Sequence, residues 1–375
     1  MRYRYVLLFS ILLMAGAARA QFSLNKGSYA LDLGGLLLVD YNYKFDLPGT
    51  TDFSKDVFRL EDARVEIKGK LKEYVKFKLQ FNLADLGASA TDPTTQALMD
   101  AYMEIGPGKY TSIQLGYAKV PYGFVSLRDA RTPFLQKPEF LHDQIMTRRA
   151  LGITFHQSFW YRHINLYAGA YNPSGEQSLS GVNDPGRMPE VIGRLEVGYP
   201  SQYSDYLEVD NTRTPVPLFF LGLNARYSNT QTPGTDTYHL YSVDGKKFTR
   251  GADLNVLYKG FGLLLEMDQV RVTPANAVSL LPFDSTTYYM AGDFVAELSY
   301  NMKPWHSLLA VRYDELNPSD LVADNTTRSI EYAYTYKIPK LGVTCKLFYA
   351  HFLPYATSGI AWKQDEVRAG LEYWF

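Results

Sequence analysis

The sequence lacks any long apolar run after its first twenty residues, and it holds little that could carry catalysis. No later stretch approaches the ~20 consecutive apolar residues that a membrane-spanning helix needs, and the mean hydropathy of the chain is -0.21. No GxSxG, Walker or HExxH motif appears, the six histidines are scattered, and no metal-ligand cluster is visible. We therefore expect no enzymatic activity, no cofactor and no metal site.

Cysteine and excess charge are also nearly absent. The single cysteine, Cys345, excludes an internal disulfide, and we interpret it as a small apolar packing residue. Removing the three arginines of residues 1–20 from the 38 basic residues leaves 35 against 39 acidic ones, a formal charge of -4. Nucleic-acid binding needs a basic surface, so nucleic acid is not an expected partner.

Residues 1–20 have the three-part pattern of a secretory signal peptide. Two arginines come first, an apolar run covers 6–15, and small residues precede Gln21. The apolar run is too short to cross a bilayer as an anchor. We predict cleavage before Gln21, so that residues 21–375 form the mature domain.

Short segments of alternating apolar and polar residues follow one another along the mature chain. In YVKFKLQFNLA, over 74–84, Val75 and Phe77 share one face while Lys76 and Lys78 share the other, which is the two-residue period of a strand. We count sixteen such segments. An even number suits a closed antiparallel barrel, whose closure leaves no unpaired strand edge in lipid.

The connections between these segments alternate in length. Tight turns at 71–73, 106–110 and 301–305 alternate with long loops rich in Gly, Pro, Ser and Asp, an arrangement typical of bacterial outer-membrane barrels. The gap at 200–215 should be a short turn and is not, and its role stays open. A soluble β-sandwich shows the same strand pattern but does not explain the loop lengths and the 15% aromatic content. We predict an all-β transmembrane antiparallel barrel of about sixteen strands.

The chain ends on QDEVRAGLEYWF, a strand pattern whose last residue lies on the apolar face. Leu371, Tyr373 and Phe375 share that face. This ending resembles the terminal signal of outer-membrane barrels, which the barrel-assembly machinery reads. We therefore expect that machinery and outer-membrane lipid as partners, and the outer membrane of a Gram-negative bacterium as the location.

The segment 120–147 is expected to be the third outer loop. It carries too many apolar residues for a solvated loop, and folding into the barrel would bury them against the wall. Arg128, Arg131 and Lys137 would then face the pore as a constriction. A surface cap or a trimer contact is the alternative.

Several stretches resemble the phosphate-selective porin O and P family, above all IQLGYAKVPYGF at 113–124, together with 58–84, 99–105 and 148–156. The resemblance implies a sixteen-stranded, typically trimeric channel with lysines and arginines at and near its constriction. The candidates for anion binding are Lys76, Lys78, Lys119, Arg128, Arg131, Lys137, Arg148 and Arg149. Three acidic residues balance the three bases of the third loop, so the resemblance supports a porin better than it supports phosphate selectivity.

We therefore expect a passive diffusion channel that admits small hydrophilic solutes, with some preference for inorganic anions. The alternative is a plugged structural or adhesive outer-membrane barrel whose long outer loops bind a partner.

Overall fold

In the residues that it describes, the computed structural model has a single sheet of seventeen strands, one short α-helix and three short 3-10 helices. It describes residues 22–45, 56–72, 74–87, 97–128, 132–135, 148–173, 188–199, 206–230, 245–275, 288–321, 326–353 and 365–375. The expected signal peptide at 1–20 lies outside these residues. None of the helices in the described ranges is long and apolar enough to cross a membrane.

The strands have the following bounds: β1 (Phe22–Lys26), β2 (Tyr29–Lys44), β3 (Val57–Leu71), β4 (Val75–Asn82), β5 (Leu98–Gly108), β6 (Thr111–Lys119), β7 (Arg149–Phe159), β8 (Ile164–Tyr171), β9 (Glu190–Tyr199), β10 (Leu218–Thr230), β11 (Gly245–Tyr258), β12 (Phe261–Pro274), β13 (Tyr289–Met302), β14 (Ser307–Asn317), β15 (Thr327–Ile338), β16 (Val343–Phe352) and β17 (Glu366–Trp374). The helices are α2 (Phe124–Leu127) and the 3-10 helices Leu83–Gly87, Trp160–Arg162 and Lys303–Trp305.

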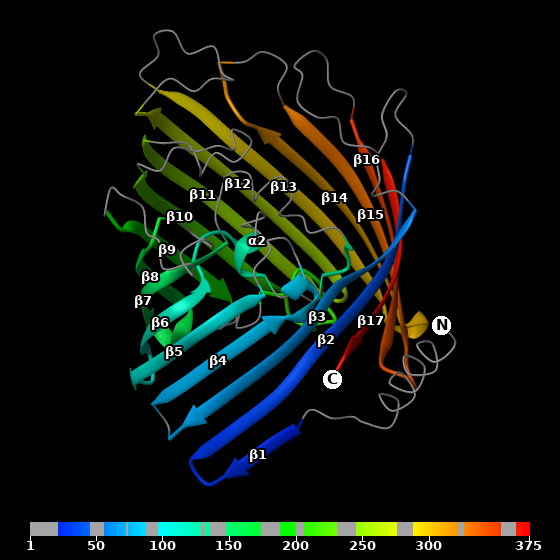
Figure 1. Cartoon of the computed structure of the whole chain (residues 1–375), viewed down its shortest axis with the longest axis horizontal. Helices are drawn as coiled ribbons and strands as arrows, with labels where there is room; N and C mark the ends of the chain where they lie inside the picture. The colour runs from blue at the N-terminus through cyan, green and yellow to red at the C-terminus, as the bar shows by residue number, and fades with distance from the viewer. Residues whose placement is uncertain are drawn as a thin grey trace.

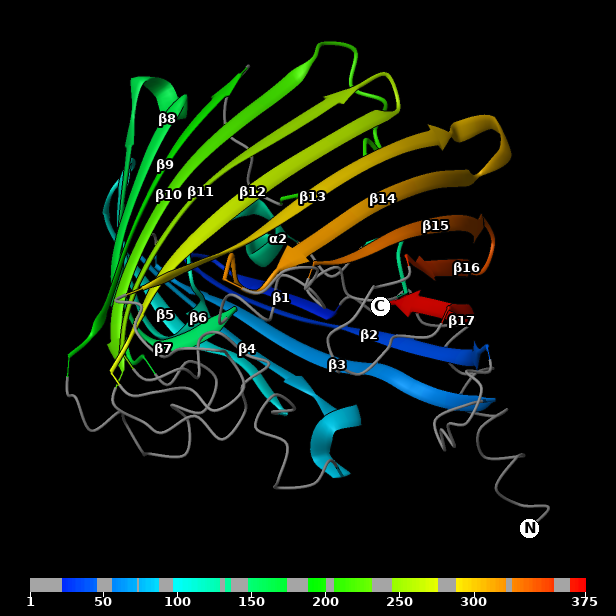
Figure 2. The ribbon, with the colours of Figure 1, turned by 90° about the horizontal axis from the view of Figure 1, so that it is seen from above.

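Strands β2 to β17 form a closed antiparallel barrel, as the sequence predicted. Each strand pairs with its neighbour along the chain, and β17 pairs with β2 from Glu366↔Lys44 to Trp374↔Leu36. The last residue continues this ladder, since Phe375 and Gly35 exchange backbone hydrogen bonds of 2.9 and 3.1 Å. Figures 1 and 2 show the strands tilted around a common interior.

The short strand β1 was not predicted. It pairs with β2 from Phe22↔Leu33 to Lys26↔Tyr29, along the same edge of β2 that β17 occupies further up. Its five residues, FSLNK, are too few to show a clear two-residue period.

The connections keep the alternation in length that the sequence showed. One end of the barrel carries short turns such as 72–74 and 259–260, and the other carries long connections such as 120–148 and 231–244. The connection at 200–217 joins β9 to β10 at the short-turn end and is the exception there. In outer-membrane barrels the short turns face the periplasm.

Side chains along each strand alternate between an apolar outer face and a polar inner face. In β17, Leu371 is 55% exposed on the outer face while its neighbour Glu372 is 5% exposed on the inner one. Exposed aromatic side chains, including Trp160, Tyr161 and Trp305, lie in turns at the short-turn end. Tyrosine and tryptophan side chains at this level suit a membrane–water interface, where the ring is apolar and its polar group stays wet.

Leu223 tests whether the outer face contacts lipid, because it is exposed near the middle of β10. We expect Leu223→Arg to lower the free energy of unfolding by about 2–4 kcal/mol, the cost of a cation on the lipid face near the bilayer midplane. Leu223→Met is the control and should change little. Urea titration in lipid vesicles measures both, and equal midpoints for the two variants would contradict lipid contact.

Candidate functional site in the barrel lumen

Lys76 and Lys78 lie on the inner face of β4, as the alternation of apolar and polar residues in 74–84 predicted. Lys76 Nζ lies 3.3 Å from a carboxylate oxygen of Glu104, and Lys78 Nζ lies 2.8 Å from Asp100 and 3.1 Å from Glu66. All three carboxylates belong to the neighbouring strands β3 and β5. Both lysines therefore point inward, where they line a cavity of about 700 Å³.

That cavity lies at the short-turn end of the lumen, against β3 to β8, and its charge is positive. Its lining includes tyrosines at 74, 102, 110, 167 and 206. The charged residues that line it are Lys68, Lys76, Lys78, Lys109, Lys119, Arg162, Asp100 and Glu104. Basic side chains therefore outnumber carboxylates in this lining, and Glu66 of the adjoining wall pairs with Lys68 and Lys78.

Arg149 shares the carboxylate of Asp100 with Lys78. Its Nε donates to Asp100 Oδ1 at 3.0 Å, and its side chain is 6% exposed. A buried arginine that lost its carboxylate would be an uncompensated charge, so this pairing stabilises the wall. Asp100 and Glu66 together thus offset Lys78 and Arg149 within the wall.

Lys119 and Arg148 hold the short helix α2 rather than standing free in the lumen. Lys119 Nζ donates to the carbonyl oxygens of Leu127, at 3.1 Å, and of Arg128. Arg148 Nε donates to the carbonyl of Ser126 at 3.3 Å. Cations at the carboxyl end of a helix satisfy its last carbonyl groups, so these two candidates position the third-loop segment.

Acidic side chains of the opposite wall hold the amino end of the same helix. Val125 N donates to Glu266 Oε2 at 2.8 Å, and Tyr122 OH donates to Asp268 Oδ1 at 2.8 Å. Gly123 N donates to Asn224 Oδ1 at 3.2 Å. Carboxylates suit the first turn of a helix because its unpaired amides point at them. Figure 2 shows α2 within the ring of strands.

Arg128 follows α2 directly and is buried. Its Nη1 lies 2.7 Å from Glu208 Oε2, and the two side chains are 2% and 3% exposed. The structure therefore places this candidate in an ion pair and not on an open pore surface. The other two bases of the loop, Arg131 and Lys137, lie outside the described residues.

Residues 132–135 extend the same segment to the far wall of the barrel. Lys346 Nζ donates to the carbonyl of Thr132 at 2.7 Å, and Arg368 Nη1 donates to that of Leu135 at 3.2 Å. The Phe134 ring packs edge-on against Phe348 at 6.3 Å between centroids. The described parts of 120–147 thus contact β10 and β12 at one side and β16 and β17 at the other.

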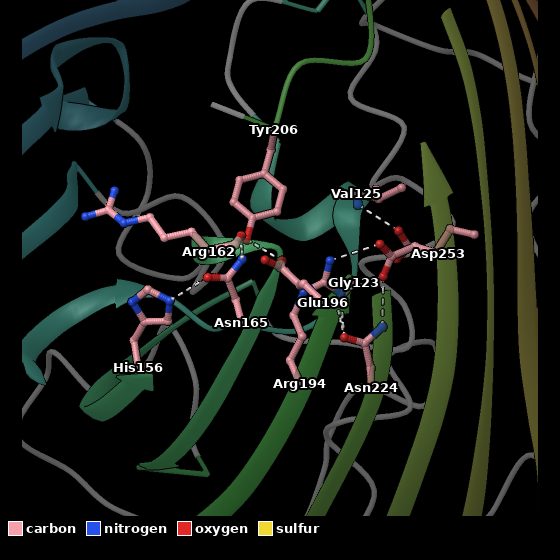
Figure 3. Close-up of polar contacts among 11 residues, drawn as sticks. Gly123, Val125, His156, Arg162, Asn165, Arg194, Glu196, Tyr206, Asn224 and Asp253 are labelled. Carbon is pink, nitrogen blue, oxygen red and sulfur yellow. Dashed lines mark hydrogen bonds and ion pairs between the residues drawn. The ribbon is translucent and has the colours of Figure 1, made fainter. Parts of the chain in front are cut away.

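A network on β9 to β11 braces the wall beneath α2. Arg194 donates to Glu196 at 2.7 Å and to both carboxylate oxygens of Asp253 at 2.5 and 2.9 Å. Tyr206 OH donates to Glu196, and Asn224 links Arg194 to Gly123. Figure 3 shows Arg194 between the two carboxylates with Tyr206 beside Glu196.

Sequence reasoning paired Arg194 with Glu196, as the structure has it, but it did not name Asp100 or Glu208, which hold Arg149 and Arg128. Asp100 could have been found, because strand parity places it on the inner face of β5 with Glu104. Glu208 lies in the gap at 200–215, whose unexpected length was the only signal. Nothing in the local sequence ties Glu208 to Arg128, since they are 80 positions apart.

Comparison with protein families decides the identity of the chain. The model of the family "phosphate-selective porin O and P" matches residues 34–237, more than half of the sequence. The chain belongs to this family. It is an outer-membrane porin of the Gram-negative type, as the sequence predicted.

Solved structures show the same fold at low sequence identity. The outer-membrane channel DcaP of Acinetobacter baumannii matches with a TM-score of 0.62 at 13% identity, covering 94% of this chain and 99% of that one. The anion-selective porin from Comamonas acidovorans matches with a TM-score of 0.54 at 14% identity, over 92% and 100%. OmpF of Salmonella typhi gives 0.59 at 12% identity, over 94% and 100%. A search of curated proteins found no match.

Gly123 tests the docking of α2 in this porin. Its φ of 65° lies in the left-handed region, and an added Cβ would lie 2.2 Å from Glu266 Oε1. We expect Gly123→Ala to destabilise the docked helix by about 1–3 kcal/mol and to speed amide hydrogen exchange at Phe124–Leu127.

Gly193→Ala is the matched control, because a Cβ at Gly193 meets no atom within 4 Å. Hydrogen exchange followed by mass spectrometry compares the two variants. Unchanged exchange in Gly123→Ala would show that the contact with Glu266 does not hold the helix.

Proposed function

We propose that this porin is a passive diffusion channel for small hydrophilic solutes with a preference for inorganic anions, and that segment 120–147 forms its constriction. The observation that carries this proposal is the cavity of about 700 Å³ at the short-turn end, with six basic side chains and two carboxylates. The contacts of α2 and of residues 132–135 with opposite walls support the constriction.

Lysines suit this role because each is a compact point charge with three donors. Lys76 and Lys109 offer an anion successive weak sites, so that it exchanges its water stepwise and is not trapped, while Lys78, held by two carboxylates, adds to the lumen potential. The family model and the fold shared with an anion-selective porin agree with this reading. Lys119, Arg148 and Arg149 act on solute through the lumen potential, since other groups of the chain hold their side chains.

The second candidate is a plugged structural or adhesive barrel whose long outer loops bind a partner. One observation favours it: the ion pair between Arg128 and Glu208 lies in the lumen, and both side chains are almost fully buried. Liposome swelling with small sugars separates the two functions, because a plugged barrel admits none. The proposed channel requires measurable swelling.

Four further assignments belong to the same proposal. Residues 1–20 form a cleaved signal peptide, and the mature porin is a homotrimer in outer-membrane lipid. Leu371, Tyr373 and Phe375 form the signal read by the barrel-assembly machinery. The outward Leu371 and the Phe375 backbone paired with Gly35 support this last role, because the signal strand also closes the barrel.

Charge removal in the cavity tests the anion preference. In a planar bilayer with a KCl gradient, we expect a reversal potential showing that Cl⁻ permeates better than K⁺. Lys76→Gln and Lys78→Gln should each lower the Cl⁻/K⁺ permeability ratio by up to about sevenfold, since a unit charge ~7 Å away in water is worth ~0.6 kcal/mol, with opposite sign for the two ions.

Lys246→Gln is the control, because it removes the same charge from the exposed outer face of β11 and not from the lumen. It should leave the ratio unchanged. Cation preference of the wild type removes the anion assignment, and the absence of any conductance removes the channel itself.

A further inference from the structure

The connection between β9 and β10 enters the lumen from the short-turn end. Its residues Glu208, Val209 and Asp210 are 3%, 2% and 1% exposed, although a connection at this end of a barrel is normally a short surface turn. The turn between β11 and β12, at 259–260, shows how few residues such a link needs. The extra length of this connection therefore has another role.

Asp210 anchors this inward segment, 206–214, to the barrel. Its carboxylate accepts hydrogen bonds from Gly260 N at 2.7 Å and from Thr214 N at 2.8 Å. Burial acts to raise the pKa of Asp210, but these hydrogen bonds outweigh it and lower the pKa. Asn301 Nδ2 donates to the Asp210 carbonyl at 3.2 Å. The segment is thus fixed at its base to the β11–β12 turn and to β13.

The tip of the inward segment contacts the third-loop segment in three ways. Glu208 pairs with Arg128 at 2.7 Å, and the Tyr206 ring packs edge-on against Phe124 at 5.6 Å between centroids. Val209 shares an apolar cluster with the third-loop residues at 134 and 135 and with wall residues of β14 and β16. Two insertions from opposite ends of the barrel therefore meet inside it.

Residues of the inward segment also line two cavities at the short-turn end. Tyr206 lines the cavity of about 700 Å³ against β3 to β8. Val209 and Asn211 line a second cavity of about 430 Å³. The charged residues and histidine lining the second cavity are Lys303, His306, Lys337, Lys346 and Glu372.

We propose that residues 206–214 are a second constricting element and that Glu208 is a specificity-determining residue of this channel. Glu208 offsets the charge of Arg128 where the two insertions meet, so that the lumen is less selective for anions than its bases alone would make it. Reducing the negative charge there strengthens the positive potential along the route beside β4 to β8. This inference rests on the proposed channel function.

Glu208→Gln removes the negative charge and keeps the side-chain shape. We expect the Cl⁻/K⁺ permeability ratio, measured in a planar bilayer, to rise about twofold or more. Arg128→Gln should shift the ratio in the opposite direction, because it leaves the carboxylate without its cation. The double variant Arg128→Gln with Glu208→Gln should return to the wild-type ratio, since both charges are then absent.

Glu315→Gln is the matched control, because Glu315 is a partly exposed carboxylate of β14 paired with Arg328 at 2.9 Å, away from the inner face. It should leave the ratio unchanged. Slower migration after heating in gel electrophoresis checks that each variant is a folded barrel, and the downward shift expected of Arg128→Gln carries the test if Glu208→Gln alone fails to fold.

The outcomes separate the two proposals. If the wild type conducts and Glu208→Gln shifts the ratio no more than Glu315→Gln does, Glu208 has no part in selectivity and the inference is overturned. If the double variant remains as shifted as Glu208→Gln, the charge of Arg128 is not what Glu208 offsets, and the inference is likewise overturned. A wild type that conducts nothing removes the channel function itself, and Glu208 then has no selectivity to determine.

Discussion

The backbone ladder between β17 and β2 is the interaction on which the rest of the barrel depends. Hydrocarbon offers no hydrogen-bonding partner, so every strand edge in the membrane must find one inside the protein. The chain meets this requirement by pairing its last strand with its first long one and by bonding Phe375 to Gly35. Closure also isolates the interior from lipid, which is why the inward side chains can be charged.

Among the described residues, most buried charged side chains inside the barrel form ion pairs with a side chain of opposite charge. A buried ion without a partner is strongly destabilising, and the walls respond with groups such as Arg194 between Glu196 and Asp253. Hydrogen bonds with charged side chains hold the third-loop segment in a similar way. The Glu266 carboxylate accepts a hydrogen bond from a backbone amide of α2, while Lys119 and Arg148 donate to its carbonyl oxygens. The potential that a solute meets comes from the charge left after these pairings.

Strand-level features were predictable because each depends on residues close in sequence. Alternation in 74–84 placed Lys76 and Lys78 on the inner face, and the ending of the chain placed Leu371 on the outer face. The contacts of the inserted segments were not predictable in the same way. Arg128 was identified as a base near the pore, yet its ion pair with Glu208 joins two connections that leave the barrel at opposite ends.

The sequence by itself determined the class of protein: a two-residue period, an even strand number, alternating connection lengths and an apolar ending together describe a closed outer-membrane barrel. These signals are local, because strand geometry alternates side chains whatever the neighbouring strand contains. Only the tertiary structure decided which charges remain for solute and which are neutralised. That outcome depends on distances between side chains far apart in the chain: the two insertions bring Glu208 to Arg128, and the packing of β5, β6 and β7 side by side brings Asp100 to Arg149.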